Sequence, residues 1–383
     1  MAWPNRAGYR GPRLVAFVWS PALVGVWSGL TIGQAMAGPA NNFSVLRLVL
    51  AAAVVVSHGF AIPTGDNTLE PFYRSTGLRL GEYAVNCFFA ISGFLVTMSF
   101  LQRGPIDYVI ARALRIIPGF LVAALVTVFV IGAACTTLPL STYFTNPALY
   151  AYLKQVVTGF KSAGAMPGVF SDNPHPWPLG TIWTLRYEIA LYGAVLLLGI
   201  AGALRTWRIA AMLVALLFIA IFAVDAFVPQ ATRYAEVLLR LIFMFVLGSF
   251  FFLARAWVRL SWVLLAALIA ATWLSHGTAI YFALLYLTLG YGVLVIAFGP
   301  QWPGVAMTER TDLSYGIYLY GWPIQQVLVQ VFPSVSLWVL LMPALFLSAL
   351  AAWGSWHWIE APALRLKVVF AKRRLSFAAG QGT

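Results

Sequence analysis

The chain has 383 residues, of which 61% are hydrophobic and only 9% are charged. A soluble domain carries about 25% charged residues, so this composition excludes a soluble globular enzyme, a disordered chain and a secreted disulfide scaffold. Because lipid requires every backbone polar group to be satisfied internally, we expect an all-α polytopic membrane protein. A β-barrel is disfavoured because the apolar stretches are continuous rather than alternating.

The apolar stretches predict a bundle of about ten transmembrane helices. A helix needs ~20 apolar residues to cross a bilayer. The predicted spans are residues 44–63, 84–101, 117–138, 182–204, 209–228, 237–254, 261–275, 280–298, 313–332 and 337–357. Two connections, 64–83 and 139–181, are too long for simple turns, and connections of that length are usually functional or disordered.

The basic residues are distributed unevenly between the predicted loops. The chain has 24 Lys and Arg against 11 Asp and Glu. In a soluble protein this excess would indicate nucleic-acid binding, but here the positive-inside rule accounts for it, and we expect no nucleic-acid partner. With the N-terminus inside, sixteen basic residues fall on the cytoplasmic side and five outside. The bias predicts a multi-pass protein of a bacterial inner membrane with both termini in the cytoplasm.

The sequence predicts one membrane domain over residues 41–365, followed by a basic cytoplasmic tail over 366–383. Residues 1–40 form a basic and apolar segment with three open interpretations. Residues 14–32 are uncharged and precede Ala35-Met36-Ala37, which resembles a signal-peptidase site. The segment is a cleaved signal peptide, an eleventh span, or an interfacial stretch, the last including a start assigned too early, with Met36 as the true first residue. We favour the third interpretation.

The first span contains two ionisable residues, Arg47 and His58. Such groups are costly within apolar spans and indicate function. They are eleven residues apart, close to three helical turns, so they share one face at about 16 Å separation along the axis. Arg47 falls near the cytoplasmic end and His58 in the outer half. A snorkelling arginine and a histidine bonded to a neighbouring helix would explain the pair without catalysis.

Further polar groups occur at three places. Arg112 and Arg115, in a predicted cytoplasmic loop, are three residues apart and would point together on a helix, where their guanidinium groups suit phosphates. A positive-inside anchor or an anionic-lipid contact would explain them equally well. Glu188, in the fourth span, would orient an imidazole or a sugar hydroxyl, or pair with Arg186 or Arg240. The three tyrosines of span 313–332 suit a cavity lining or an interfacial aromatic belt.

Six ordered motifs make the chain resemble the membrane acyltransferase-3 family from about residue 41 to 365. They are Arg47-x10-His58, Phe89-x-Ile91-Ser92-Gly93-Phe94, Arg112-x-x-Arg115, Trp183-x-Leu185-x-x-Glu188, Ser314-Tyr315-x-x-Tyr318-Leu319 and Glu360-x-Pro362. Each motif alone is weak, but the order and spacing of all six are specific. The chain resembles the stand-alone type of this family, so we expect no fused hydrolase-like domain.

The resemblance implies an O-acyltransferase that moves an acyl group, usually acetyl, from cytoplasmic acyl-CoA to a hydroxyl of an extracytoplasmic glycan such as a polysaccharide or lipopolysaccharide. Acetyl-CoA would be a co-substrate, the surroundings would be membrane lipid, and no metal is expected. The candidate site residues are Arg47, His58 and Glu188 for catalysis, Arg112 and Arg115 for the CoA donor, and Trp183, Tyr315 and Tyr318 for the substrate.

Acyl transfer to an alcohol requires a base for the hydroxyl proton and a donor for the developing oxyanion. His58 suits the base or a transient acyl carrier, and the sequence leaves both open. His175 and His276 fall in or beside outer loops with no partner evident from the sequence. The chain departs from the family at Gly321, where many relatives carry His, and at residues 179–181, where Leu-Gly-Thr replaces Asn-Gly-Ser. The first departure puts a second catalytic histidine in doubt, and the second concerns acceptor choice.

A transporter or flippase of a lipid-linked or anionic glycan is the alternative function. Buried Arg, His and Glu side chains would serve it equally well. The chain lacks the internal repeat symmetry that many transporters show, and the ordered motifs favour the enzyme.

Overall fold

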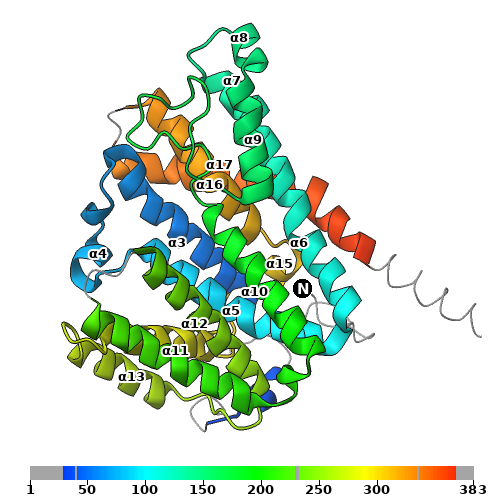
Figure 1. The fold of residues 1–383 in the computed structure, drawn as a ribbon, viewed down its shortest axis with the longest axis vertical. Coiled ribbons are helices and arrows are strands. Elements are labelled where there is room, and N and C mark those ends of the chain that lie inside the picture. The colour runs from blue at the N-terminus through cyan, green and yellow to red at the C-terminus, as the bar shows by residue number, and fades with distance from the viewer. Residues whose placement is uncertain (1–28, 39–40, 229–232, 334–335, 368–383) are drawn as a thin grey trace, which may run out of the picture. The chain divides into compact units, whose positions relative to one another are not determined.

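A computed structural model describes residues 29–38, 41–228, 233–333 and 336–367 (Figure 1). Within these residues the regular structure is helical, apart from two isolated β-bridges. The all-α prediction is therefore confirmed. Most of the N-terminal segment and most of the basic tail lie outside the described residues, and so do the predictions made for them.

Each of the ten predicted spans coincides with a helix. The helices are α3 (Phe43–Thr64), α5 (Leu80–Arg103), α6 (Pro105–Val126), α10 (Trp183–Ile200), α11 (Trp207–Phe227), α12 (Arg233–Leu253), α13 (Trp262–Leu274), α14 (Tyr281–Ala297), α16 (Ser314–Val331) and α17 (Leu337–Ser355). Among the described residues, 7 helices are long and apolar enough to cross a membrane. The other three are α13 and α14, with 13 and 17 residues, and the more polar α16.

The third helix begins earlier than predicted. We placed its start at residue 117, but α6 begins at Pro105 and continues through the π-helical turn η2 (Thr127–Ile131) into α7 (Gly132–Cys135). Pro105 suits the first helical turn, where an N–H has no helical partner. Gly104 before it has a φ of 77°, which favours glycine. Arg112 and Arg115 therefore lie in a helix and not in the predicted loop.

The two long connections contain short helices. The first holds η1 (Asn67–Leu69) and α4 (Pro71–Thr76), and the second holds α8 (Leu140–Thr145) and α9 (Pro147–Gly159). The remaining short elements are α2 (Ile32–Met36), η3 (Ala203–Arg205), α15 (Val305–Arg310) and the π-helical turn η4 (Trp356–Glu360). Both connections are therefore structured within the described residues.

The chain divides into two compact units. Unit 1 comprises Met1–Leu48, Asn86–Leu95 and Leu204–Asp312, and unit 2 comprises Val49–Val85, Val96–Ala203 and Leu313–Thr383. In unit 1, α11 packs against α12 and α14. In unit 2, α16 packs against α17 and α6, and α6 also contacts α9, α10 and η4 (Figure 1).

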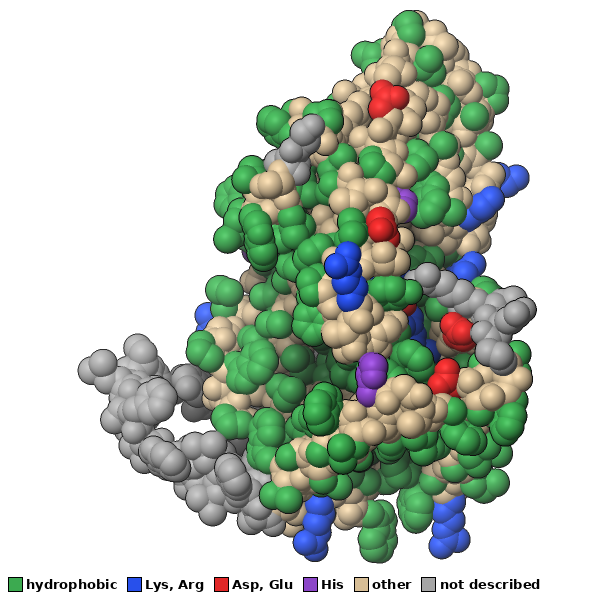
Figure 2. Space-filling view, turned by 90° about the vertical axis from the view of Figure 1, so that its left-hand side faces the viewer, with side chains coloured by type: hydrophobic (Ala, Val, Ile, Leu, Met, Phe, Trp, Pro, Cys, Tyr) green, Lys and Arg blue, Asp and Glu red, His purple; other side chains and the backbone are tan. Residues whose placement is uncertain are grey.

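Many large apolar side chains are exposed, as expected for a protein surrounded by lipid. Examples are Trp273, which is 77% exposed, and Met342, which is 74% exposed. Figure 2 shows hydrophobic side chains spread over the visible face, with Lys and Arg in a few separate places. A surface of this kind is unfavourable in water and favourable in a bilayer.

Within unit 1, glycines allow α5 and α12 to cross at close range. A Cβ atom at Gly93 would lie 1.9 Å from the Phe245 carbonyl oxygen, and one at Gly248 would lie 2.0 Å from the Ala90 carbonyl oxygen. The Ser249 hydroxyl donates to the Gly93 carbonyl oxygen at 3.2 Å. Small residues at such crossings let helix backbones approach within a membrane.

We expect Gly93→Ala to destabilise the protein by about 1–3 kcal/mol, because the added methyl group overlaps backbone that cannot move aside alone. The matched control is Gly193→Ala in α10, where a Cβ atom meets nothing within 4 Å. The control should be neutral or slightly stabilising, since alanine is the better helix former. Thermal unfolding in detergent measures both, and equal melting temperatures would contradict the close crossing.

Candidate active site

His58 lies on the part of α3 that belongs to unit 2 and packs against Trp322 of α16. The two ring centroids are 4.9 Å apart, and the planes meet at 80°. The indole is fixed, because its Nε1 donates to the Trp177 carbonyl oxygen at 2.6 Å. His58 Nδ1 is buried and has no hydrogen-bond partner among the described residues. A buried ring nitrogen without a protein partner is suited to a substrate or a water molecule.

The connection before α10 brings a second histidine to the same indole. The His175 ring centroid lies 6.1 Å from that of Trp322 and 5.3 Å from that of Trp177. Gln326 of α16 holds this connection, since its Nε2 donates to the carbonyl oxygens of His175 and Trp177. Asn173 Nδ2 in turn donates to Gln326 Oε1 at 2.7 Å. These partners of His175 were not predicted from the sequence.

Position 321, one of the two departures from the family pattern, is closely packed and leaves little room for a side chain. A Cβ atom at Gly321 would lie 2.7 Å from Cγ2 of Val55 on α3. The neighbouring Gly180 is confined in the same way, because its Cβ atom would lie 2.3 Å from the Trp322 ring. The two histidines next to Trp322 therefore lie in α3 and in the connection 139–181.

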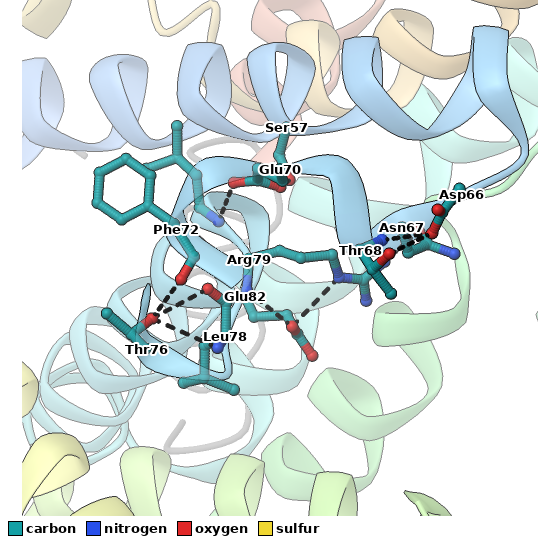
Figure 3. A network of polar contacts seen from close by, with 11 residues as sticks. Ser57, Asp66, Asn67, Thr68, Glu70, Phe72, Thr76, Leu78, Arg79 and Glu82 are labelled. Atoms are coloured by element: carbon teal, nitrogen blue, oxygen red, sulfur yellow. Dashed lines mark hydrogen bonds and ion pairs between the residues drawn. The ribbon is translucent and has the colours of Figure 1, made fainter. Parts of the chain in front are cut away.

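A polar network fixes the segment that follows α3 (Figure 3). The buried Glu70 carboxylate accepts from the hydroxyl of Ser57, the residue before the α3 histidine, at 2.7 Å. Arg79 Nε pairs with Glu82 Oε2 at 3.2 Å, and an Arg79 amino group donates to Asn67 Oδ1 at 2.5 Å. The network thus holds a fixed cation, Arg79, in this part of unit 2.

Arg79 acts electrostatically on His175, the histidine of the connection 139–181. Burial and, to a lesser extent, Arg79 lower the pKa of His175 below its usual value. His175 is therefore neutral at pH 7, with one ring nitrogen as donor and the other as acceptor.

Arg47 lies in unit 1 and is paired with a carboxylate. Its guanidinium group donates to Asp312 Oδ2 at 3.0 Å, in the segment before α16. Arg47 and His58 both lie in α3, as predicted. The partner of Arg47 belongs to unit 1, whereas the aromatic partner of His58 belongs to unit 2. Direct action of Arg47 together with His58 stays a prediction.

Arg115 belongs to a cluster formed by α6, α16 and η4. Its guanidinium group lies 3.6 Å from the Glu360 carboxylate and 5.5 Å from the centroid of the Tyr315 ring. The Tyr315 hydroxyl donates to the Ile116 carbonyl oxygen at 2.9 Å. Glu360 stands at the end of the π-helical turn η4, where Ser355 Oγ donates to its other oxygen at 3.0 Å. Such turns are frequent at functional sites.

Arg112 lies one turn away in α6, with its guanidinium carbon 5.6 Å from the centroid of the Tyr192 ring. The Tyr192 hydroxyl donates to Glu188, one turn earlier in α10. The Tyr108 hydroxyl of α6 donates to the Tyr192 carbonyl oxygen at 2.9 Å. The structure thus groups Glu188 with the predicted donor-side arginine, and a catalytic role for Glu188 stays a prediction.

The remaining predicted substrate residues pack around the start of α10. The Tyr318 hydroxyl donates to the Thr181 carbonyl oxygen at 2.7 Å and lies 2.5 Å from the Thr184 hydroxyl. Trp183 packs edge-to-face on Tyr187, with centroids 5.9 Å apart. Tyr318 therefore positions α10, and its contact with a substrate stays a prediction.

Sequence reasoning missed several polar residues of these clusters. Two of them had usable signals. Tyr192 lies four residues after Glu188, the spacing of neighbours on one helix face, and Gln326 is a polar residue inside an apolar span. Ser57, Glu70 and Asp312 had none, because their partners lie in loops or far along the chain.

Comparison with known proteins identifies the chain. The acyltransferase-domain model of the acyltransferase-3 type matches residues 41–356. The protein named O-acetyl transferase of Shigella phage Sf6 is 27% identical over 334 residues, which cover 84% of this chain and 95% of that protein. Nodulation protein 10 of Rhizobium leguminosarum bv. viciae is 29% identical over 371 residues, which cover 89% of this chain and 98% of that protein.

No solved structure matches the chain. The family match extends over most of the sequence. It includes Arg47 and His58 of α3 and Arg112 and Arg115 of α6. Together with the helical, apolar fold, it shows that the chain belongs to the acyltransferase-3 family and is a membrane O-acyltransferase.

Proposed function

We propose that the protein transfers an acetyl group from cytoplasmic acetyl-CoA to a hydroxyl group of an extracytoplasmic carbohydrate, such as a surface polysaccharide or lipopolysaccharide, in a bacterial inner membrane. The main support for the proposal is the buried Nδ1 of His58 beside Trp322, which has no hydrogen-bond partner in the described part of the chain. The name of the phage relative, O-acetyl transferase, supports acetyl as the group transferred.

His58 acts as the general base in this reaction. Its ring accepts the proton of the acceptor hydroxyl while the hydroxyl oxygen attacks the thioester carbonyl carbon. The new C–O bond forms, the C–S bond breaks, and the proton passes from the imidazole to the departing thiolate. Products are the O-acetylated carbohydrate and free CoA.

Arg112 and Arg115 bind the donor in this scheme. Acetyl-CoA carries phosphate groups that cannot enter lipid, so fixed cations at the cytoplasmic surface should hold them. Both arginines are held by aromatic rings of neighbouring helices, Tyr192 and Tyr315. The cytoplasmic side itself follows from the distribution of basic residues between the loops.

Sealed membrane vesicles test the proposal, because acetyl-CoA does not cross lipid. Inside-out vesicles from a producing strain, given radiolabelled acetyl-CoA, should consume it and label the carbohydrate. Right-side-out vesicles should do neither until they are permeabilised, and vesicles from a deletion strain provide the background. Equal labelling by both sealed orientations would contradict the cytoplasmic donor site, and label recovered only in lipid or protein would contradict the carbohydrate acceptor.

A further inference from the structure

Two histidine rings in unit 2 share one indole, and each has a buried nitrogen without a hydrogen-bond partner among the described residues. These atoms are Nδ1 of His58 and Nε2 of His175, on rings centred 4.9 Å and 6.1 Å from Trp322. A buried polar atom left unpaired costs about 1–3 kcal/mol. Two such atoms beside one ring therefore indicate a place where an external polar group is bound.

The position of His175 is determined by built contacts. Pro174 and Pro176 flank the residue and restrict the backbone on both sides. Gln326 binds the His175 carbonyl group, and the Trp322 indole N–H binds the carbonyl group of Trp177. These contacts hold the segment that carries the His175 imidazole against α16. The same segment fixes the indole beside His58, because the Trp177 carbonyl group accepts a hydrogen bond from it.

The arrangement suits a carbohydrate. Neighbouring carbons of a sugar ring usually carry hydroxyl groups, so a base at one hydroxyl places the next within reach of a second hydrogen-bonding group. A neutral imidazole offers one donor and one acceptor for that purpose. Trp177 is tilted at 33° to His175 and is 37% exposed, which provides an apolar surface for the C–H face of a sugar.

We propose that His175 is an acceptor-binding residue whose Nε2 hydrogen-bonds the sugar hydroxyl adjacent to the one that His58 deprotonates. This inference rests on the proposed carbohydrate acceptor. Under this proposal the connection 139–181 takes a direct part in selecting the acceptor. A sugar without the neighbouring hydroxyl would leave Nε2 of His175 unpaired.

The test uses the full-length protein in lipid nanodiscs with acetyl-CoA and the carbohydrate extracted from a deletion strain. His175→Phe keeps an aromatic ring against Trp322 and Trp177 but removes the nitrogen. We expect the KM for the carbohydrate to rise about tenfold or more. The KM for acetyl-CoA and the slow hydrolysis of acetyl-CoA without carbohydrate should not change. His175→Gln, which retains a hydrogen-bonding group, should restore part of the affinity.

The matched control is His276→Phe, at an exposed histidine of another connection, which should behave as wild type. An unchanged KM for the carbohydrate in His175→Phe would overturn the inference, and so would equal losses in both KM values and in hydrolysis, which a purely structural role produces. If the Phe variant is not recovered as a monodisperse protein, His175→Ala replaces it with the same expected rise. Inactive wild-type protein would refute the proposed function and this inference with it, whereas active wild type with an indifferent variant refutes this inference alone.

Discussion

Replacement of His58 by Ala is expected to abolish acyl transfer while the protein stays inserted and folded. In the proposed reaction His58 is the base, and loss of a positioned general base costs about 10²–10⁴-fold in rate. The ring has no hydrogen bond from Nδ1 to the described protein, so its removal breaks no polar contact there. His58→Gln should fail as well, because an amide fills the space but accepts no proton at neutral pH. Transfer of radiolabel from acetyl-CoA to the carbohydrate measures the effect.

The control for this experiment is His357→Ala. His357 lies in η4, is exposed and contacts the Trp353 carbonyl oxygen at 2.8 Å through Nδ1. His357→Ala should retain acyl transfer. The comparison then shows that activity is lost because the base is removed and not because any histidine is replaced. Membrane yield and melting temperature of each variant show whether it is folded. Acetylation near the wild-type level in a well-expressed His58→Ala strain would refute the catalytic assignment.

The sequence predicted the helices well because the bilayer leaves few alternatives. Long apolar stretches must form helices when backbone groups cannot bond to water. The main error was the start of α6, because the predicted apolar span began only at residue 117 and the arginines before it were assigned to a loop. Charges do not end a helix, and a helix that begins at the membrane surface can carry its arginines in its first turns. Hydropathy alone therefore misplaced that boundary by twelve residues, from Pro105 to residue 117.

The sequence predicted less of the site, because periodicity gives neighbours only within one helix. It placed Arg47 and His58 on α3, but not their partners Asp312 and Trp322, which lie more than 250 residues away along the chain. The grouping of His175 with His58 was equally inaccessible. It depends on Gln326 holding the connection 139–181 against α16, a tertiary contact that no local pattern encodes.

The proposed role of Arg115 in binding the donor can be separated from a role in stabilising the fold through its partner Glu360. The Glu360 side chain is 2% exposed. Arg115→Gln leaves this carboxylate without its cation, and breaking a buried ion pair typically costs about 3–5 kcal/mol. Glu360→Gln leaves the arginine without its carboxylate. The double variant removes both charges, so it should regain much of the lost melting temperature.

Affinity for acetyl-CoA should not follow this recovery. If Arg115 binds a phosphate of the donor, the affinity falls about tenfold or more in both Arg115→Gln and the double variant, because a hydrogen bond to a charged group is lost in each. Glu360→Gln should bind acetyl-CoA at least as well as wild type, since the Arg115 guanidinium group no longer pairs with the Glu360 carboxylate. Arg115→Lys keeps the charge but not the planar fork and should rescue binding only in part. Calorimetric titration in nanodiscs measures each affinity, and wild-type affinity in the stable double variant would assign Arg115 to the fold alone.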